Sequence, residues 1–223
     1  DTSEKRPAVI FLHERYGIVQ HTRDLGERLA RDGYVACLPD LFHRFDGDRE
    51  ALALGEERVD LRDEESLADL DDAVAFLRQQ SYVDGDQIGV VGVCQSGREP
   101  LLYAAHRHDV PSVVVMYGGQ IVETGTTSDI LTRPEHPYTQ GLLASLPGIG
   151  DRDVRLNPIP GTVPSAVDWP EGCRFRDRCA FAWELCAESA PELLPVEAGS
   201  SRSARCWRVH PDESSIGPAG EPS

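Results

Sequence analysis

The sequence is nearly free of lysine and holds no long apolar run. Lys5 is the single lysine among 223 residues, and no G-x-x-x-x-G-K-[ST] phosphate loop surrounds it. No apolar stretch approaches the roughly 18 residues that a membrane-spanning helix needs. We therefore expect neither nucleotide binding through a phosphate loop nor insertion into a membrane.

Basic residues are also few in comparison with acidic ones. Lysine and arginine together number 22 against 38 aspartate and glutamate residues, which gives a formal net charge of −16. Such a surface repels the phosphate backbone of nucleic acids, so we expect no nucleic-acid partner. We interpret the acidic excess as a heavily solvated surface, which indicates little about the fold.

The beginning of the chain carries no charged segment followed by an apolar one. The chain starts at Asp1, and we expect no secretion signal and a cytoplasmic location. The absence of an initial methionine predicts that the true N-terminus lies upstream or was removed.

The first half of the chain alternates between apolar runs and helical patterns. This alternation predicts a mostly parallel α/β sheet. Leu70, Val74 and Leu77 continue the helical spacing that Leu67 begins, so the acidic run at 46–72 is expected to be the solvated face of an amphipathic helix. The other expected elements are strands at 8–12, 34–38, 88–93 and 113–116, a helix at 20–32, and a helix that follows the turn at 94–97 and ends at about 107.

After Gly119 the pattern changes. We expect a strand at 120–123, a helix that begins with a capping residue near 126–129, and a helix at 138–146. The segment 147–172 is rich in proline and glycine and is expected to be an extended loop. From His210 onward the composition is typical of a disordered tail.

A small-residue frame surrounds Cys94 between an expected strand and an expected helix. The segment reads Gly92-Val93-Cys94-Gln95-Ser96-Gly97, which with one residue of freedom is a nucleophile turn. Glycines permit the sharp backbone turn, and a helix N-terminus favours thiolate over thiol. The alternative is a buried structural cysteine before a helix, and the turn alone does not distinguish the two.

Several motifs of the first half resemble the dienelactone hydrolase family in their order. Residues 7–45 run from Pro-Ala-Val-Ile-Phe-Leu-His-Glu-Arg-Tyr-Gly to Pro-Asp-Leu-Phe-His-Arg, and the turn reads Val-Gly-Val-Cys-Gln-Ser-Gly. The resemblance covers about 7–118 and implies a truncated α/β-hydrolase-type parallel sheet. It also implies a hydrolase of ester or lactone bonds in a small substrate, without a cofactor.

The same resemblance implies roles for four residues. Cys94 would be the nucleophile, and Glu14 the carboxylate that contacts the resting thiol. The backbone N–H groups of Gln95 and Arg15 would form the oxyanion hole.

The family completes its triad with an aspartate and then a histidine after the nucleophile, and neither is found here. His106 and His108 belong to the helix after the nucleophile and are expected to face solvent, while His136 and His210 lack the expected sequence context. Acyl transfer needs a proton shuttle. We therefore expect weak or absent turnover.

The second half carries a different set of motifs. They are Tyr-Gly-Gly-Gln-Ile-Val-Glu-Thr-Gly at 117–125, Arg-Pro-Glu-His-Pro-Tyr-Thr at 133–139, Ile-Pro-Gly-Thr-Val-Pro-Ser at 159–165 and Gly-Cys-Arg-Phe-Arg-Asp-Arg-Cys at 172–179. Residues about 114–208 thereby resemble the C-terminal extension of oligopeptide and dipeptide ABC-transporter ATPases. The resemblance implies a peptide permease as a partner.

Four cysteines of this half are spaced C-x5-C-x6-C-x19-C. This spacing matches neither the paired knuckles of zinc ribbons nor the common ferredoxin runs. The transporter resemblance implies an iron–sulfur cluster, with structural zinc or two disulfides as the alternatives. The cysteines concerned are Cys173, Cys179, Cys186 and Cys206.

The chain therefore divides into a hydrolase-like domain at 1–118, a loop-rich, cysteine-containing transporter tail at 119–210 and a disordered end at 211–223. Both families place an apolar strand ending in Tyr-Gly-Gly near 113–119, which makes the joint locally consistent. The hydrolase sheet is expected to lose the strands beyond this edge, which favours association and marginal stability. Three functions stay open: an impaired hydrolase, a transport component without its nucleotide site, and a non-functional hybrid.

Overall fold

A computed structural model gives the structure of the chain as two compact units. The first comprises Asp1–Val114 and the second Val115–Ser223. The domain boundary at 118 stays a prediction. The residues that the structure describes are 5–107, 110–117, 119–146, 159–161 and 169–210.

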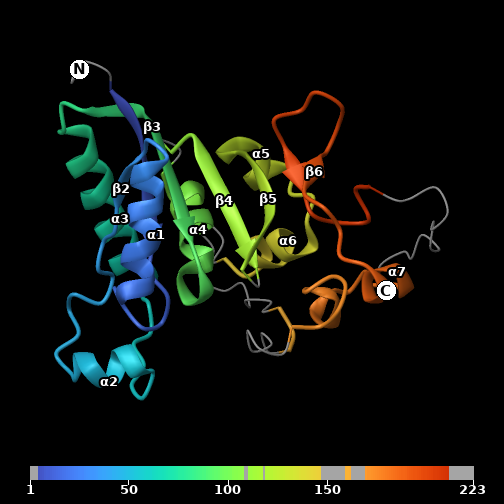
Figure 1. The fold of residues 1–223 in the computed structure, drawn as a ribbon, viewed down its shortest axis with the longest axis horizontal. Coiled ribbons are helices and arrows are strands. Elements are labelled where there is room, and N and C mark those ends of the chain that lie inside the picture. Colours follow the sequence, from blue (N-terminus) through green and yellow to red (C-terminus); the bar gives the residue numbers. More distant parts are fainter. Residues whose placement is uncertain (1–4, 108–109, 118, 147–158, 162–168, 211–223) are drawn as a thin grey trace. The chain divides into compact units, whose positions relative to one another are not determined.

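The first unit contains a parallel sheet with the strand order β2-β1-β3-β4 (Figure 1). In register, Ala8 lies opposite Val35, and Ile10 lies opposite Val90. Because these strands are short apolar runs joined through helices, the parallel arrangement follows from the sequence, and the expected α/β fold is confirmed. The strands are β1 (Arg6–Leu12), β2 (Val35–Cys37), β3 (Val83–Gly92) and β4 (Ser112–Tyr117).

Helices of the first unit pack on this sheet and on one another. Helix α3 contacts β3, β1 and α4, and α1 contacts β2. The expected nucleophile turn forms a short 3₁₀ helix, η1, and the helix expected after it is α4. The helices are α1 (Gln20–Arg31), α2 (Arg49–Leu54), α3 (Asp63–Arg78), η1 (Cys94–Arg98) and α4 (Glu99–His106).

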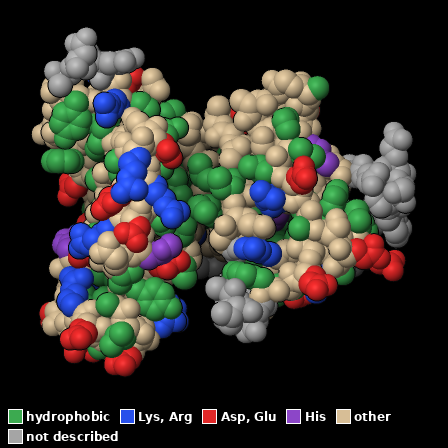
Figure 2. Space-filling view, in the orientation of Figure 1, with side chains coloured by type: hydrophobic (Ala, Val, Ile, Leu, Met, Phe, Trp, Pro, Cys, Tyr) green, Lys and Arg blue, Asp and Glu red, His purple; other side chains and the backbone are tan. Residues whose placement is uncertain are grey.

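The core of the first unit joins the sheet to α3. Leu70, Val74 and Leu77 are buried and Leu67 is partly buried, as their helical spacing predicts. Burial of such a side chain stabilises the fold by about 1.5–3 kcal/mol. The acidic run forms two helices instead of one, and its charged side chains lie outside the core. Figure 2 shows acidic side chains over the segment around α2.

The second unit continues from residues 115–117 at the end of β4, with the strand order β4-β5-β7-β6. Strand β7 pairs antiparallel with both β5 and β6. The edge beyond β4, which the sequence predicts to be uncovered, is therefore occupied by β5 from the transporter-like part. The strands are β5 (Gln120–Thr126), β6 (Leu194–Pro195) and β7 (Ser203–Ala204).

Short helices complete the second unit. The hydroxyl of Thr126 accepts a hydrogen bond from the N–H of Asp129 at 3.2 Å, which confirms the expected capping residue. The helix expected at 138–146 is α6. The helices are α5 (Thr127–Thr132), α6 (Pro137–Ala144), η2 (Arg176–Arg178) and α7 (Glu184–Glu188).

An aromatic cluster forms the core of the second unit. The ring of Tyr117, at the end of β4, lies 4.7 Å from the ring of Tyr138 and 5.1 Å from that of Phe175, centroid to centroid. Tilted and edge-on pairs at these distances are favourable beyond their buried area. Strand β4, at which the two parts of the chain join, therefore ends in Tyr117, which packs with residues of the transporter-like part.

Within the described ranges, no helix is long and apolar enough to cross a membrane. Most of the extended loop expected at 147–172 lies outside the described residues. The tail expected to be disordered also lies outside them, apart from His210.

Candidate active site and cysteine cluster

Cys94, the first residue of η1, has a strained backbone conformation just after β3. Its φ angle is 57°, and no other non-glycine residue in the described part of the chain has a positive φ. The left-handed region costs an L-residue about 1–2 kcal/mol. The Cys94 thiol is exposed. The sharp turn predicted from the glycine frame is therefore present.

Small residues make this turn possible. A Cβ atom at Gly92 would collide with the carbonyl oxygen of Ser96, and it would lie 2.8 Å from Cδ of Pro100. The Ser96 hydroxyl accepts a hydrogen bond from the N–H of Val93 at 3.2 Å and donates one to the carbonyl oxygen of Val93 at 3.0 Å. The backbone on both sides of Cys94 is thus fixed by close contacts.

Gln95 lies at the second position of η1. Its side-chain amide donates to the carbonyl oxygen of Val59 at 2.6 Å, which holds the residue in place. The first N–H groups of a helix have no partner within the helix. The predicted role of the Gln95 N–H in an oxyanion hole stays a prediction.

The loop after β1 holds the other two predicted residues. The carbonyl oxygen of Glu14 accepts a hydrogen bond from the N–H of Gly17 at 3.1 Å. The Arg15 guanidinium donates to the carbonyl oxygen of Gly55 at 2.9 Å and lies over the ring of Tyr16. No contact recorded for the described side chains joins Glu14 to Cys94. The predicted contact between them stays a prediction.

His13 anchors this loop, a role that the sequence reasoning missed. Its Nε2 accepts a hydrogen bond from the N–H of Leu41 at 3.0 Å, and its Nδ1 lies 2.7 Å from the carbonyl oxygen of Glu14. These partners assign the proton to Nδ1. Burial lowers the pKa of His13, although the Glu14 carbonyl and Asp40 act in the opposite direction. The only signal in the sequence is a histidine directly after a buried strand.

None of the histidines considered for the triad is hydrogen-bonded to Cys94 in the described part of the chain. His106 is half-buried, not solvent-facing as expected, because its Nδ1 bonds the carbonyl oxygen of Leu102 at 2.9 Å. His136 is buried in the second unit, and Nε2 of His210 lies 3.2 Å from the carbonyl oxygen of Leu194. His108 lies outside the described residues.

Glu99, at the start of α4, is a buried carboxyl group that the sequence reasoning also missed. It is 1% exposed, and its Oε2 has no hydrogen-bond partner within the described structure. Burial raises the pKa of Glu99 to about 7, Arg98 opposes this rise and Asp63 adds to it. Arg98 forms ion pairs with both carboxylates. A glutamate next to a proline at the start of an apolar helix was the available signal.

The four cysteines of the second half lie around one pocket. It is also lined by aromatic residues and by Arg176 and Arg208. Burial raises the pKa of the Cys173 and Cys179 thiols, and it raises that of Cys206 to about 11. The cysteines that line the pocket are Cys173, Cys179, Cys186 and Cys206.

These residues do not fit the predicted metal site. Four thiols are a suitable donor set for zinc or an iron–sulfur cluster, but the thiolate is the form that binds metal. Burial favours the thiol form of Cys173, Cys179 and Cys206. In the described ranges, no group of three or more histidine, cysteine or acidic side chains is arranged to hold a metal ion. All six cysteines are free thiols. Neither an iron–sulfur cluster nor zinc is therefore supported.

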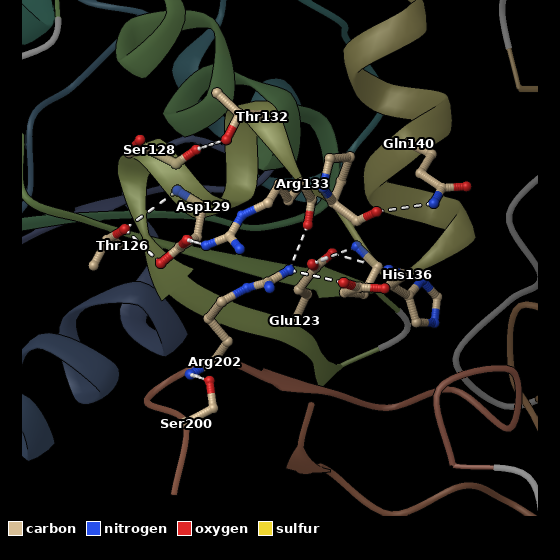
Figure 3. Close-up of polar contacts among 12 residues, drawn as sticks. Glu123, Thr126, Ser128, Asp129, Thr132, Arg133, His136, Gln140, Ser200 and Arg202 are labelled. Carbon is tan, nitrogen blue, oxygen red and sulfur yellow. Dashed lines mark hydrogen bonds and ion pairs between the residues drawn. The ribbon is translucent and has the colours of Figure 1, made fainter. Parts of the chain in front are cut away.

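A buried polar network fixes the His-Pro-Tyr segment of the second unit (Figure 3). The Glu123 carboxylate, which is 2% exposed, accepts the N–H groups of Glu135 at 2.7 Å and His136 at 3.1 Å. Nδ1 of His136 accepts the N–H of Tyr138 at 3.0 Å and caps α6. Burial lowers the pKa of His136 to about 3. This histidine is therefore a neutral structural residue that ties α6 to β5.

Comparison with known proteins finds a matching family for each of the two parts of the chain. Residues 1–140 match the sequence profile of the dienelactone hydrolase family, which is more than half of the 223 residues. The chain belongs to the dienelactone hydrolase family. Residues 122–186 of this family member also match the C-terminal region of oligopeptide and dipeptide transporters. The two matches overlap in β5, α5 and the start of α6.

Curated relatives of this dienelactone hydrolase family member are transporter subunits. The oligopeptide transport ATP-binding protein AppD of Bacillus subtilis is 41% identical over 120 residues, which cover 52% of this chain and 36% of AppD. The dipeptide transport ATP-binding protein DppD of Haemophilus influenzae is 45% identical over 94 residues, with 42% and 28% covered. The chain thus spans about a third of these relatives' length.

Similar solved structures are dienelactone hydrolases. One from Klebsiella pneumoniae is 33% identical and aligns with a TM-score of 0.46, covering 52% of this chain and 49% of that one. The dienelactone hydrolase-like phosphotriesterase P91 from metagenomic libraries is 22% identical, with a TM-score of 0.41 and with 52% and 48% covered.

Proposed function

We propose that the first unit is a hydrolase of ester or lactone bonds that uses Cys94 as its nucleophile and that its turnover is impaired. The left-handed backbone of Cys94, with its exposed thiol at the start of η1, is the observation that carries this proposal. Backbone strain of this kind is retained in proteins where it positions a reacting group. Membership of the dienelactone hydrolase family supports the same role.

In the proposed reaction, the Cys94 thiolate attacks the carbonyl carbon of the substrate, and negative charge moves to the carbonyl oxygen. The N–H groups of Gln95 and Arg15 are the proposed donors to that oxygen. Expulsion of the alkoxide leaves a thioester on Cys94, which water then hydrolyses. Glu14 is the proposed carboxylate that contacts the resting thiol.

The proposed impairment follows from proton transfer. An alkoxide leaves faster when an acid protonates it, and water attacks a thioester faster when a base removes its proton. A positioned acid–base group contributes about 10²–10⁴-fold to such steps. Because no described histidine bonds Cys94, we propose that acylation by an activated ester is faster than hydrolysis of the thioester.

The test uses p-nitrophenyl acetate, whose leaving group needs no proton. We expect a burst approaching one nitrophenolate per chain, followed by slow turnover, and trapping of an acetylated Cys94 by mass spectrometry. Cys94→Ala should abolish the burst, whereas Cys37→Ala, at the half-buried cysteine of β2, should keep it. Equal nitrophenolate release by wild type and Cys94→Ala would contradict the proposal.

A second candidate function concerns residues 122–186. We propose that this part docks on a peptide permease without supplying a nucleotide site, and the match to the transporter C-terminal region favours it. The chain should co-elute with a detergent-solubilised peptide permease from its source and should not bind a fluorescent ATP analogue. Failure of both the burst and the co-elution would leave the non-functional hybrid.

A further inference from the structure

The two loops that carry the proposed oxyanion donors start side by side. Strands β1 and β3 are parallel neighbours, and Leu12, the last residue of β1, lies opposite Gly92, the last residue of β3. Arg15 follows the first strand and Gln95 follows the second. Ligands of such sheets bind beyond the carboxyl ends of the strands. The sheet therefore brings both residues to one end, but it does not set the distance between their N–H groups.

One short stretch, 55–59, accepts a side-chain hydrogen bond from each of these two residues. The Arg15 guanidinium donates to the carbonyl oxygen of Gly55 at 2.9 Å. The side-chain amide of Gln95 donates to the carbonyl oxygen of Val59 at 2.6 Å. Both acceptors come directly after α2, which lies beyond the carboxyl end of β3 (Figure 1). The 55–59 stretch thus bridges the two loops.

The 55–59 stretch is itself held in place at both ends. Before it, Leu52 of α2 is 1% exposed, and its carbonyl oxygen accepts a hydrogen bond from the N–H of Gly55 at 3.0 Å. At its other end, the side chain of Val59 packs against the core of the first unit. The two carbonyl acceptors are therefore fixed points for the loops that bind them.

The contact at Gly55 involves the whole turn that contains Arg15. A Cβ atom at Gly55 would lie 2.8 Å from Cε1 of Tyr16 and 3.2 Å from a guanidinium nitrogen of Arg15. Both residues belong to the turn in which the N–H of Gly17 donates to the carbonyl oxygen of Glu14. The 55–59 stretch therefore holds the turn that carries the N–H of Arg15, and not only the end of a long side chain.

We propose that Arg15 and Gln95 are positioning residues, whose side chains set the distance between their own backbone N–H groups by holding both loops on the 55–59 stretch. This inference rests on the proposed function, in which these two N–H groups stabilise the charge on the carbonyl oxygen of the substrate. Donors that are fixed before the reaction need no reorganisation when this charge develops. The two side chains then promote only those reactions of Cys94 that place charge on such an oxygen.

Two reactions of Cys94 separate this role from a general structural one. Acylation by p-nitrophenyl acetate develops negative charge on a carbonyl oxygen, whereas alkylation by iodoacetamide displaces iodide from a saturated carbon and develops no such charge. Gln95→Met and Arg15→Met keep the backbone N–H groups and remove the side-chain donors. We expect each variant to lower the rate of the nitrophenolate burst about 10-fold. The alkylation rate of Cys94, measured by peptide mass mapping, should stay unchanged.

Two further variants are the controls. The side-chain amide of Gln87 donates to the Asp84 carboxylate at 2.8 Å in the first part of β3, away from Cys94. Gln87→Met therefore removes a comparable hydrogen bond, and both rates should keep their wild-type values. Arg15→Lys keeps a donor at the end of a long side chain and should recover part of the acylation rate that Arg15→Met loses.

The shared stretch also predicts that the two effects are coupled. Loss of either contact already changes the distance between the two N–H groups. The double variant of Gln95→Met and Arg15→Met should therefore lower the burst rate by less than the product of the two single effects.

The outcomes distinguish this inference from the proposed function. Unchanged acylation in either single variant, or an equal fall in acylation and alkylation, would overturn the positioning role while the burst of the wild-type chain still stands. A double variant whose effect equals the product of the single effects would show that the loops are held independently, and it would overturn the role of the shared stretch. The absence of a burst from the wild-type chain would contradict the proposed function and this inference with it.

Discussion

Cys94 and Cys37 contain the same thiol in different surroundings. Cys94 is exposed, whereas burial raises the pKa of the half-buried Cys37. Because the thiolate is the reactive form, we expect iodoacetamide to label Cys94 several-fold faster than Cys37 in the native protein. Peptide mass mapping over time measures the two rates. Equal rates in the native chain would show that the strained turn gives Cys94 no advantage.

Glu99 predicts an unusual dependence of stability on pH. Its pKa is about 7 in the folded chain against an ordinary 4.5, so between these values the folded state holds a proton that the unfolded state lacks. The free energy of unfolding should therefore fall as pH rises from about 4.5 to about 7 and should then level off, a loss of about 2–4 kcal/mol from this residue.

Glu99→Gln replaces the titrating carboxyl group with an amide that has no charge at any of these pH values. The variant should therefore not lose stability between pH 4.5 and pH 7 through this residue. Urea unfolding at pH 5 and pH 8 measures the difference, and we expect the variant to be the more stable protein at pH 8. The comparison with wild type cancels other groups such as Glu123, whose pKa burial also raises. Identical pH slopes for wild type and Glu99→Gln would mean that the buried carboxyl group is not the cause.

At the scale of elements, the turn from β3 into η1 depends on one glycine. Gly92→Ala would place a methyl group against the carbonyl oxygen of Ser96, and we expect a loss of about 2 kcal/mol or more from the free energy of unfolding. Gly89→Ala is the matched control in the same strand, since its Cβ would lie 3.8 Å from the carbonyl oxygen of Ser112. Similar unfolding midpoints for both variants in urea would argue against a strained turn.

Elements of the first half could be predicted because their residues carry local signals. Apolar runs predicted the strands Arg6–Leu12 and Ser112–Tyr117. A helical pattern that a glycine ends predicted the helix Gln20–Arg31. The prediction of a single helix in the acidic region was wrong. Asp48 caps a separate short helix, α2, with its side-chain carboxylate. In the sequence, a capping aspartate before so short a helix looks like any other acidic residue of the surrounding run.

The whole molecule joins two families at β4. The sequence predicts that the chain is marginally stable or aggregates, although β5 is the neighbour of β4 at the edge that was expected to be open. We expect a low and broad thermal transition and oligomers in size-exclusion chromatography. A sharp, cooperative melt of a monomer would contradict this, because it would show that the joined parts stabilise each other.

Whether the joint exists in the genome is a separate prediction. The sequence is equally compatible with a real recombination and with an artefact of gene assembly. One primer before the codon of Cys94 and one after that of Cys173 distinguish them, because a single product in this reading frame from source DNA would make the joint real. The absence of a product would mean that each part belongs to a different complete protein.

By itself, the sequence determined both family resemblances, the α/β class and the strained turn at Cys94, because each depends on residues that are neighbours in the chain. Only the tertiary structure decided what His13, Glu99 and Glu123 do. Their partners lie on other elements, and burial, which sets their charge, depends on how those elements pack. The four cysteines make the same point: their spacing left a metal site and disulfides open, and only the tertiary structure shows that all four line one pocket.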